Sequence, residues 1–146
     1  MSKRLVVLEA VKALIVEAAP MAEVLGLDGG EAAARRTHPD GIIEVGAGDL
    51  GEPEAMLSPL TYLYDHTIPV EVVGTSEMAI DAIMTAIGLG VAANRTLGGL
   101  CDWLDVTAAA TESLGATDER GNLAARPDRG GSFTIIASYS TPNPLA

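Results

Sequence analysis

The chain has little of several residue types on which common protein functions depend. Its single cysteine, Cys101, excludes a disulfide within the chain and suits a reducing compartment. Aromatic residues make up 3% of the sequence, so aliphatic side chains must fill the core. Lys and Arg total 9 against 20 Asp and Glu, and the net charge is -11. A protein that binds nucleic acid through its backbone needs a basic face, so this composition argues against that class.

Long apolar runs are also missing. The opening stretch MSKRLVVLEAVKALIV starts with basic residues and continues with apolar ones, as a signal peptide does, but Glu9 and Lys12 interrupt it. No apolar stretch approaches the roughly 20 residues that a membrane-spanning helix needs. We therefore expect a soluble protein that is made in the cytoplasm and has no membrane partner.

The chain does contain a hydrophobic fraction of 48% over 146 residues, with no internal repeat or linker, so we expect one domain over its whole length. Apolar residues recur with helical or strand periodicity. The expected elements are helices near 3–19 and 76–94 and strands near 41–46, 60–73, 101–107 and 132–140. Ser2 and either Thr75 or Ser76 are the expected N-caps. Gly88 and Gly90 weaken the second helix and indicate close packing on a sheet.

The order of these elements predicts an α+β fold, because helices and strands do not alternate as they do in parallel sheets. Two main helices should pack on a mostly antiparallel sheet. In the strand near 60–73, His66 falls on the apolar face and should be a hydrogen-bonded interior residue. Pro69 cannot donate to a ladder, so its strand is an edge or is bulged there. The segment GDLGEPEAMLSPL, with two prolines and two glycines, predicts an exposed loop over 46–58.

The stretch NRTLGGLCDWLD, residues 94–105, contains the features that most resemble a chemical site. It lacks the glycine pattern and the lysine of a phosphate-binding loop, so a helix end with Asn94 or Gly98 in a left-handed cap fits better. Cys101 has no histidine near it in sequence and is expected to be a buried, small apolar residue. Trp103 is either an interface anchor or a plug in the core.

Other residues give no stronger sign of catalysis. One cysteine and two distant histidines match no metal-ligand spacing, and we expect neither a metal nor a cofactor. The carboxylates of Asp49, Glu52 and Glu54 lie close in sequence, and two of them could form an acid–base pair, but solvated loop acids are far more common. The residues alone therefore favour a binding or structural role over an enzyme.

Three longer stretches together resemble a known family, the tail terminators of siphophages and prophages, also called tail-completion or minor tail proteins. GEPEAMLSPLTYLYDHTIPVEV is similar to the pattern around the first hairpin of that family. AIDAIMTAIGLGVAANRTLGGLCDWLD is similar to its helix and the Arg-Thr-Leu-Gly-Gly-Leu turn that follows. YSTPNPLA is similar to its C-terminal ending. The resemblance covers most of the chain from about Gly41 onward, whereas the loop DGGEAAARRTHPDG departs from the family pattern.

This resemblance implies a small α+β subunit that assembles as a hexameric ring on the head-proximal end of the tail tube. The ring ends tube polymerisation and presents a surface to the head–tail connector, or stopper, protein. DNA passes through its lumen without specific binding, and an acidic subunit suits that passage. The expected location is the virion, and the expected partners are further copies of the chain, the tail tube protein and the connector.

Ring contacts are expected through the loop 46–58, the loop 112–131 and strand edges near Pro69. The expected interface residues are Asp49, Glu52, Glu54, Arg35, Arg36, Arg95, Trp103 and Tyr139. The alternatives are another ring subunit of the neck or connector, and a small cytoplasmic enzyme that uses Cys101.

Overall fold

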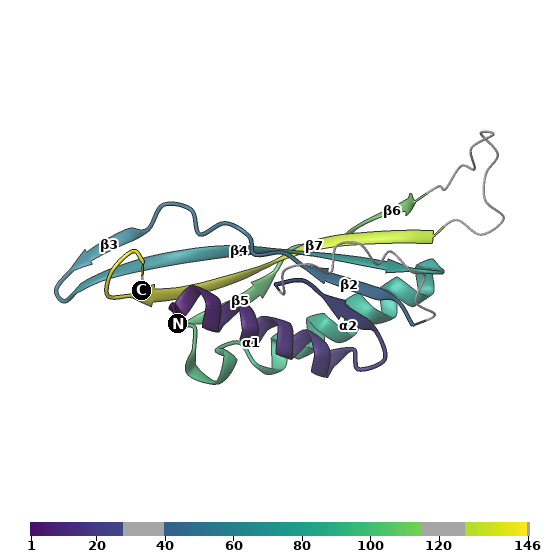
Figure 1. Cartoon of the computed structure of the whole chain (residues 1–146), viewed down its shortest axis with the longest axis horizontal. Coiled ribbons are helices and arrows are strands. Elements are labelled where there is room, and N and C mark those ends of the chain that lie inside the picture. Colours follow the sequence, from purple (N-terminus) through teal and green to yellow (C-terminus); the bar gives the residue numbers. More distant parts are fainter. Residues whose placement is uncertain (28–39, 115–127, 146) are drawn as a thin grey trace.

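The computed structural model describes residues 1–27, 40–114 and 128–145, which form two main helices and a seven-stranded sheet (Figure 1). This arrangement confirms the α+β fold. The helical elements are α1 (Lys3–Ala18), α2 (Glu77–Ala93) and the short 3-10 helix η2 (Leu97–Gly99). The strands are β1 (Glu23–Leu25), β2 (Ile42–Val45), β3 (Glu54–Leu57), β4 (Leu60–Gly74), β5 (Trp103–Val106), β6 (Ala110–Leu114) and β7 (Asp128–Thr141).

Two long antiparallel strands form the centre of the sheet. β4 and β7 pair from Tyr62 opposite Thr141 to Gly74 opposite Arg129. β2 and β3 pair with β4, whereas β5 and β6 pair with β7. β1 extends the sheet beyond β2 and runs parallel to it, so the sheet is mostly antiparallel, as expected.

The two helices lie against one face of this sheet (Figure 1). The hydroxyl of Ser2 accepts from the Leu5 N–H at 3.3 Å and caps α1, and the hydroxyl of Ser76 accepts from the Ala79 N–H at 3.1 Å and caps α2. Alternate residues of β4 and β7 point toward the helices, which gives the sheet one buried and one solvated face. The central core consists of Val7, Leu8, Val11, Ile15, Ile43, Ile68, Val70, Val72, Ile80, Ile87, Val91, Leu104 and Ile135.

Three strands were not expected from the sequence. Part of the segment expected to be a loop, residues 54–57, forms β3, which pairs with the start of β4 as a hairpin. β1 and β6 are also new, and only their pairing to longer strands marks them as strands. Such short segments carry too few alternating residues to distinguish a strand from a loop.

Pro69 lies opposite a bulge and does not lie at a sheet edge. Its strand, β4, has β2 on one side and β7 on the other. Val45 pairs with Val70, and Asp49 bridges Thr67, so three residues of one segment face two of the other. The expectation of an exposed strand edge near Pro69 is therefore wrong, because the Gly46 N–H donates to the Pro69 carbonyl at 2.9 Å.

The glycines of α2 do not pack on the sheet, contrary to expectation. A Cβ added at Gly90 would lie 3.3 Å from Cδ2 of Leu14, so Gly90 allows close approach of α1. A Cβ added at Gly88 would meet nothing within 4 Å. Only Gly90 thus has a packing role, and that role joins the two helices.

Candidate interaction surface

The stretch 94–105 is a structural connection between α2 and β5. The Oδ1 atom of Asn94 accepts from the Gly98 N–H at 3.1 Å, and η2 carries the chain to β5. Gly98 has φ 67° and Gly99 has φ 96°, a region that favours glycine. Asn94 itself has φ -142°, so the positive-φ residues of the turn are Leu97, with φ 49°, and the two glycines that follow it, and not Asn94. Gly98 and Gly99 therefore allow the backbone conformation that this turn requires.

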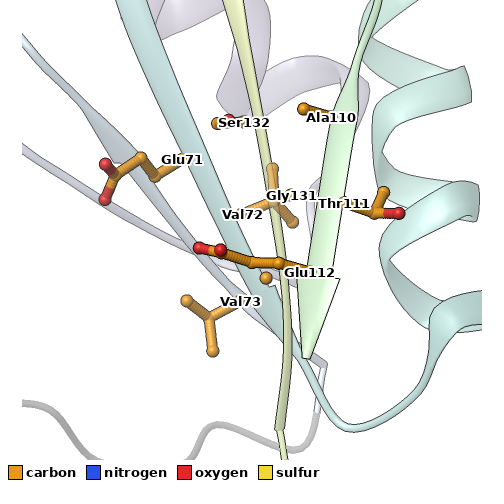
Figure 2. Close-up of a pocket in the computed structure, with 9 residues that line it drawn as sticks. Glu71, Val72, Val73, Ala110, Thr111, Glu112, Gly131 and Ser132 are labelled. Atoms are coloured by element: carbon orange, nitrogen blue, oxygen red, sulfur yellow. The ribbon is translucent and has the colours of Figure 1, made fainter. Parts of the chain in front are cut away.

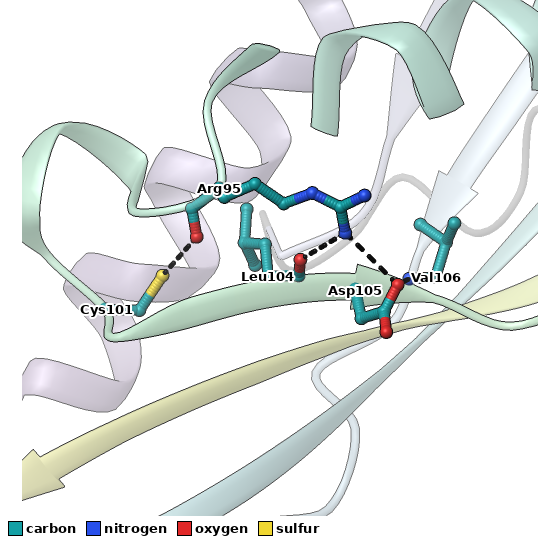
Figure 3. A network of polar contacts seen from close by, with 5 residues as sticks. All are labelled: Arg95, Cys101, Leu104, Asp105 and Val106. Carbon is teal, nitrogen blue, oxygen red and sulfur yellow. Dashed lines mark hydrogen bonds and ion pairs between the residues drawn. The ribbon is translucent and has the colours of Figure 1, made fainter. Parts of the chain in front are cut away.

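Cys101 is buried, as expected, and lies directly below this turn. Its thiol donates a long hydrogen bond of 3.7 Å to the Arg95 carbonyl (Figure 3). Burial, and secondarily the charge of Asp102, raise the pKa of the Cys101 thiol above its ordinary value. A nucleophilic cysteine needs the opposite shift, so this environment disfavours thiolate chemistry.

His66 and Tyr139 meet inside the core. The Nε2–H of His66 donates to the Ala47 carbonyl at 2.7 Å, and its Nδ1 lies 3.1 Å from the Tyr139 hydroxyl. The expectation of a hydrogen-bonded interior histidine is therefore confirmed. Tyr139 is only 1% exposed, so it lies in the core and reaches no partner in this conformation. The expectation that Tyr139 is an interface residue is therefore wrong.

Arg95 and Trp103 lie together at the surface. The Trp103 side chain is not a core plug, because the residue is 52% exposed. The Arg95 guanidinium lies 5.0 Å from the centre of the Trp103 ring, and its Nη1 atom pairs with Asp105 Oδ1 at 3.2 Å. Arg and Trp are the residue types most enriched among the energetically dominant residues of interfaces.

The acidic residues expected at the interface are all exposed. Asp49 forms an isolated bridge with Thr67, and its Oδ1 accepts from the Gly51 N–H at 2.8 Å. Glu52 follows in the loop, and Glu54 begins β3. The other expected interface residues, Arg35 and Arg36, lie outside the described residues, as does most of the expected loop 112–131.

The hairpin of β3 and β4 presents a feature that the sequence analysis missed. Every residue of β3 is exposed, and the hairpin extends beyond the ends of the helices (Figure 1). Met56, Leu57 and Leu60 place large apolar side chains at its end, and Leu57 is 83% exposed. We call these three residues the apolar tip. Leu57 and Leu60 are direct partners across the hairpin, so these two exposed apolar side chains lie on the same face, and such a group on a folded chain can mark a contact with another molecule.

A groove of about 230 Å³ lies where β4, β7 and β6 run together (Figure 2). Glu71 and Glu112 provide carboxylates, and Gly130 and Gly131 contribute backbone to the lining. This lining contains no basic side chain and would repel an anionic ligand. Among the described residues, no three His, Cys, Asp or Glu side chains are grouped to hold a metal ion.

Comparisons with known proteins give no family for this chain. No model of a protein family matches it, and no curated protein matches it. In the described part of the chain, no helix is both long enough and apolar enough to cross a membrane.

Proposed function

We propose that this chain is a structural protein of a phage tail, a ring subunit that caps the tail tube, ends its polymerisation and joins it to the head connector. The observation that carries the proposal is the exposed apolar tip at the end of the β3–β4 hairpin. The resemblance of residues from Gly41 onward to tail terminators supplies the particular role.

The hairpin has the properties of an arm that packs on a neighbouring subunit. β3 pairs with β4 on one side and lies away from the helices, so its own domain does not cover its side chains. Burying one Leu or Met side chain contributes about 1.5–3 kcal/mol. A tip at one end of the domain that binds a different surface of the next copy is a head-to-tail contact, and such contacts give a closed ring when the rotation from one copy to the next divides a full turn.

The charge of the chain supports passage of DNA through the ring. Glu44 and Glu71 are directly opposite each other on the solvated face of the sheet, and Asp65 lies on the same face farther along β4. These carboxylates, together with the net charge of -11, repel phosphate groups. An acidic ring would let DNA slide through its lumen without holding it.

An enzyme that uses Cys101 is disfavoured, because the thiol is buried and its pKa is raised. A neck or connector subunit would also form a ring, and the effect of gene deletion separates the two roles. Loss of a terminator should give filled heads and separate tails of uncontrolled length in electron micrographs. Loss of a neck subunit should give tails of normal length that do not join heads. Normal-length tails attached to filled heads would refute both roles.

A further inference from the structure

β5 is the last strand of the sheet path, and its outer edge is a possible template for another strand. In an antiparallel strand, the backbone groups of alternate residues point to opposite sides. The Thr107 N–H, just after β5, donates to the Thr134 carbonyl of β7 at 2.9 Å. The backbone groups of Val106 and Leu104 therefore point away from β7. Unpaired groups on such an edge invite pairing with a strand of another molecule.

Other groups of the same chain form hydrogen bonds with these outward-facing backbone groups (Figure 3). The Leu104 N–H donates to the Arg95 carbonyl at 2.7 Å, and the Leu104 carbonyl accepts from Arg95 Nη1 at 2.8 Å. The Val106 N–H donates to Asp105 Oδ1 at 2.9 Å. Both backbone groups of Leu104 and the N–H of Val106 are thus satisfied without a partner strand.

Three contacts hold the Arg95 side chain across this edge. Its guanidinium binds the Leu104 carbonyl, pairs with Asp105 at 3.2 Å and lies 5.0 Å from the centre of the Trp103 ring. The Arg95 backbone is positioned by the turn that begins at Asn94. The side chain therefore lies where the backbone of an incoming strand would have to lie.

We propose that Arg95 and Asp105, here called the edge guard, prevent β5 of a second copy of this chain from pairing with β5. Every copy carries the same short apolar strand at the same edge, so two copies related by a two-fold axis would extend each other's sheets. Such a dimer would join two domains edge to edge and compete with any other mode of assembly. The edge guard thus blocks the backbone groups with which a second β5 strand would pair. The inference is independent of the function proposed above.

The test removes the edge guard with the double variant Arg95→Ala/Asp105→Ala. The matched control, Arg129→Ala/Glu77→Ala, removes another exposed ion pair, 2.7 Å long, and also leaves the net charge unchanged. Analytical ultracentrifugation measures self-association, and the fluorescence of Trp103, the single tryptophan of the chain, reports burial at β5 itself. We expect the double variant to self-associate about tenfold more tightly than the wild type, or more, with a blue shift of Trp103 emission that grows with concentration. The control should match the wild type in both measurements.

A folded double variant, as shown by circular dichroism, with wild-type association and emission would overturn the proposal. If the double variant does not fold, amide hydrogen exchange in the wild-type chain decides. Slow exchange at Val106 supports the edge guard, because this amide donates to the Asp105 side chain. Exchange at Val106 as fast as at solvated loop amides overturns it, whereas the Leu104 amide binds the backbone carbonyl of Arg95 and serves as an internal reference.

Discussion

The Tyr139 hydroxyl of β7 donates a hydrogen bond of 3.1 Å to Nδ1 of His66 on β4, inside the core. The direction of this bond follows from the second nitrogen of the ring. The Ala47 carbonyl, 2.7 Å from Nε2, can only accept, so Nε2 carries the proton of the neutral ring and Nδ1 has the free lone pair. Burial raises the pKa of Tyr139 to about 12, so its hydroxyl keeps its proton over the physiological range.

This arrangement predicts a loss of stability in mild acid. Burial, in the first place, lowers the pKa of His66 below its ordinary 6.5, and protonation would also force the Tyr139 hydroxyl to give up its role as donor. The unfolded chain then binds a proton more readily than the folded one, so stability is present above about pH 6.5 and falls as the pH drops toward the lower pKa of the folded state. The slope reaches at most about 1.4 kcal/mol per pH unit for this one proton.

Urea unfolding between pH 7.5 and pH 5 measures this slope. The variant His66→Gln keeps a polar side chain of similar volume but does not titrate, so the difference in slope between the two proteins isolates His66. Equal slopes in the wild type and in the variant would show that His66 does not contribute to the pH dependence.

The sequence predicted the long helices and strands, because apolar residues recur with a constant period along each of them. The alternation from Tyr64 to Val72 matches the buried face of β4, and the helical stripe through Ile80, Ile83 and Ile87 matches the buried face of α2. Local chemistry also predicted the cap at Ser2 and narrowed the second cap to Thr75 or Ser76, of which the structure uses Ser76, since capping depends on neighbouring residues.

The candidate interaction surface was less predictable, because the exposure of a side chain depends on residues that are distant in the sequence. Trp103 is exposed because its side chain lies on the solvated face of the sheet, whereas Leu104, the next residue of β5, is buried. Nothing within β5 specifies which face the helices cover. Tyr139 is buried since β4 and the helices cover it. The apolar tip was hidden within a segment read as a loop, although Met56 and Leu57 are unusual residues for a solvated loop. The prolines and glycines of this segment predicted a loop, so its exposed apolar residues were not recognised as a candidate contact surface.

The conformation of the turn after α2 predicts opposite effects of alanine at two glycines. An added Cβ meets nothing within 4 Å at either Gly98 or Gly88, so steric contact with neighbours is equal at the two sites. Gly98 has φ 67°, where a side chain costs about 1–2 kcal/mol, whereas Gly88 lies in α2. We expect Gly98→Ala to destabilise the protein by about that amount and Gly88→Ala to stabilise it by up to about 1 kcal/mol. Denaturant unfolding measures both, and equal effects would contradict the role of backbone geometry.

The burial of Cys101 predicts slow reaction with thiol reagents. The sulfur is shielded in the native protein, and the raised pKa leaves less thiolate to react. Labelling should be at least about tenfold slower in the native state than in denaturant. Thr96→Cys in a Cys101→Ala background is the control, because Thr96 is exposed on the same turn. Native labelling of Cys101 as fast as that of the control would reopen the enzymatic alternative.

The apolar tip predicts that one surface substitution should affect assembly without affecting the fold. Leu57→Asp replaces a residue that is 83% exposed, so the free energy of unfolding of the monomer should change by less than about 0.5 kcal/mol. If Leu57 is buried against the next subunit of a ring on the tail tube, loss of its apolar contact should weaken assembly by about 1.5–3 kcal/mol, or roughly 10- to 150-fold. Binding of the purified chain to isolated tail tubes measures this effect.

Met78→Asp provides the matched control, since Met78 is 84% exposed at the start of α2 and receives the same charge. In infected cells, a terminator with Leu57→Asp should release tails of uneven, excessive length, because the tube end keeps its free edges for the next tube ring. Met78→Asp should leave tail length unchanged. If both variants impair assembly equally, added negative charge explains the defect and the hairpin has no special role. If neither impairs it, the apolar tip is not the subunit contact of the proposed ring.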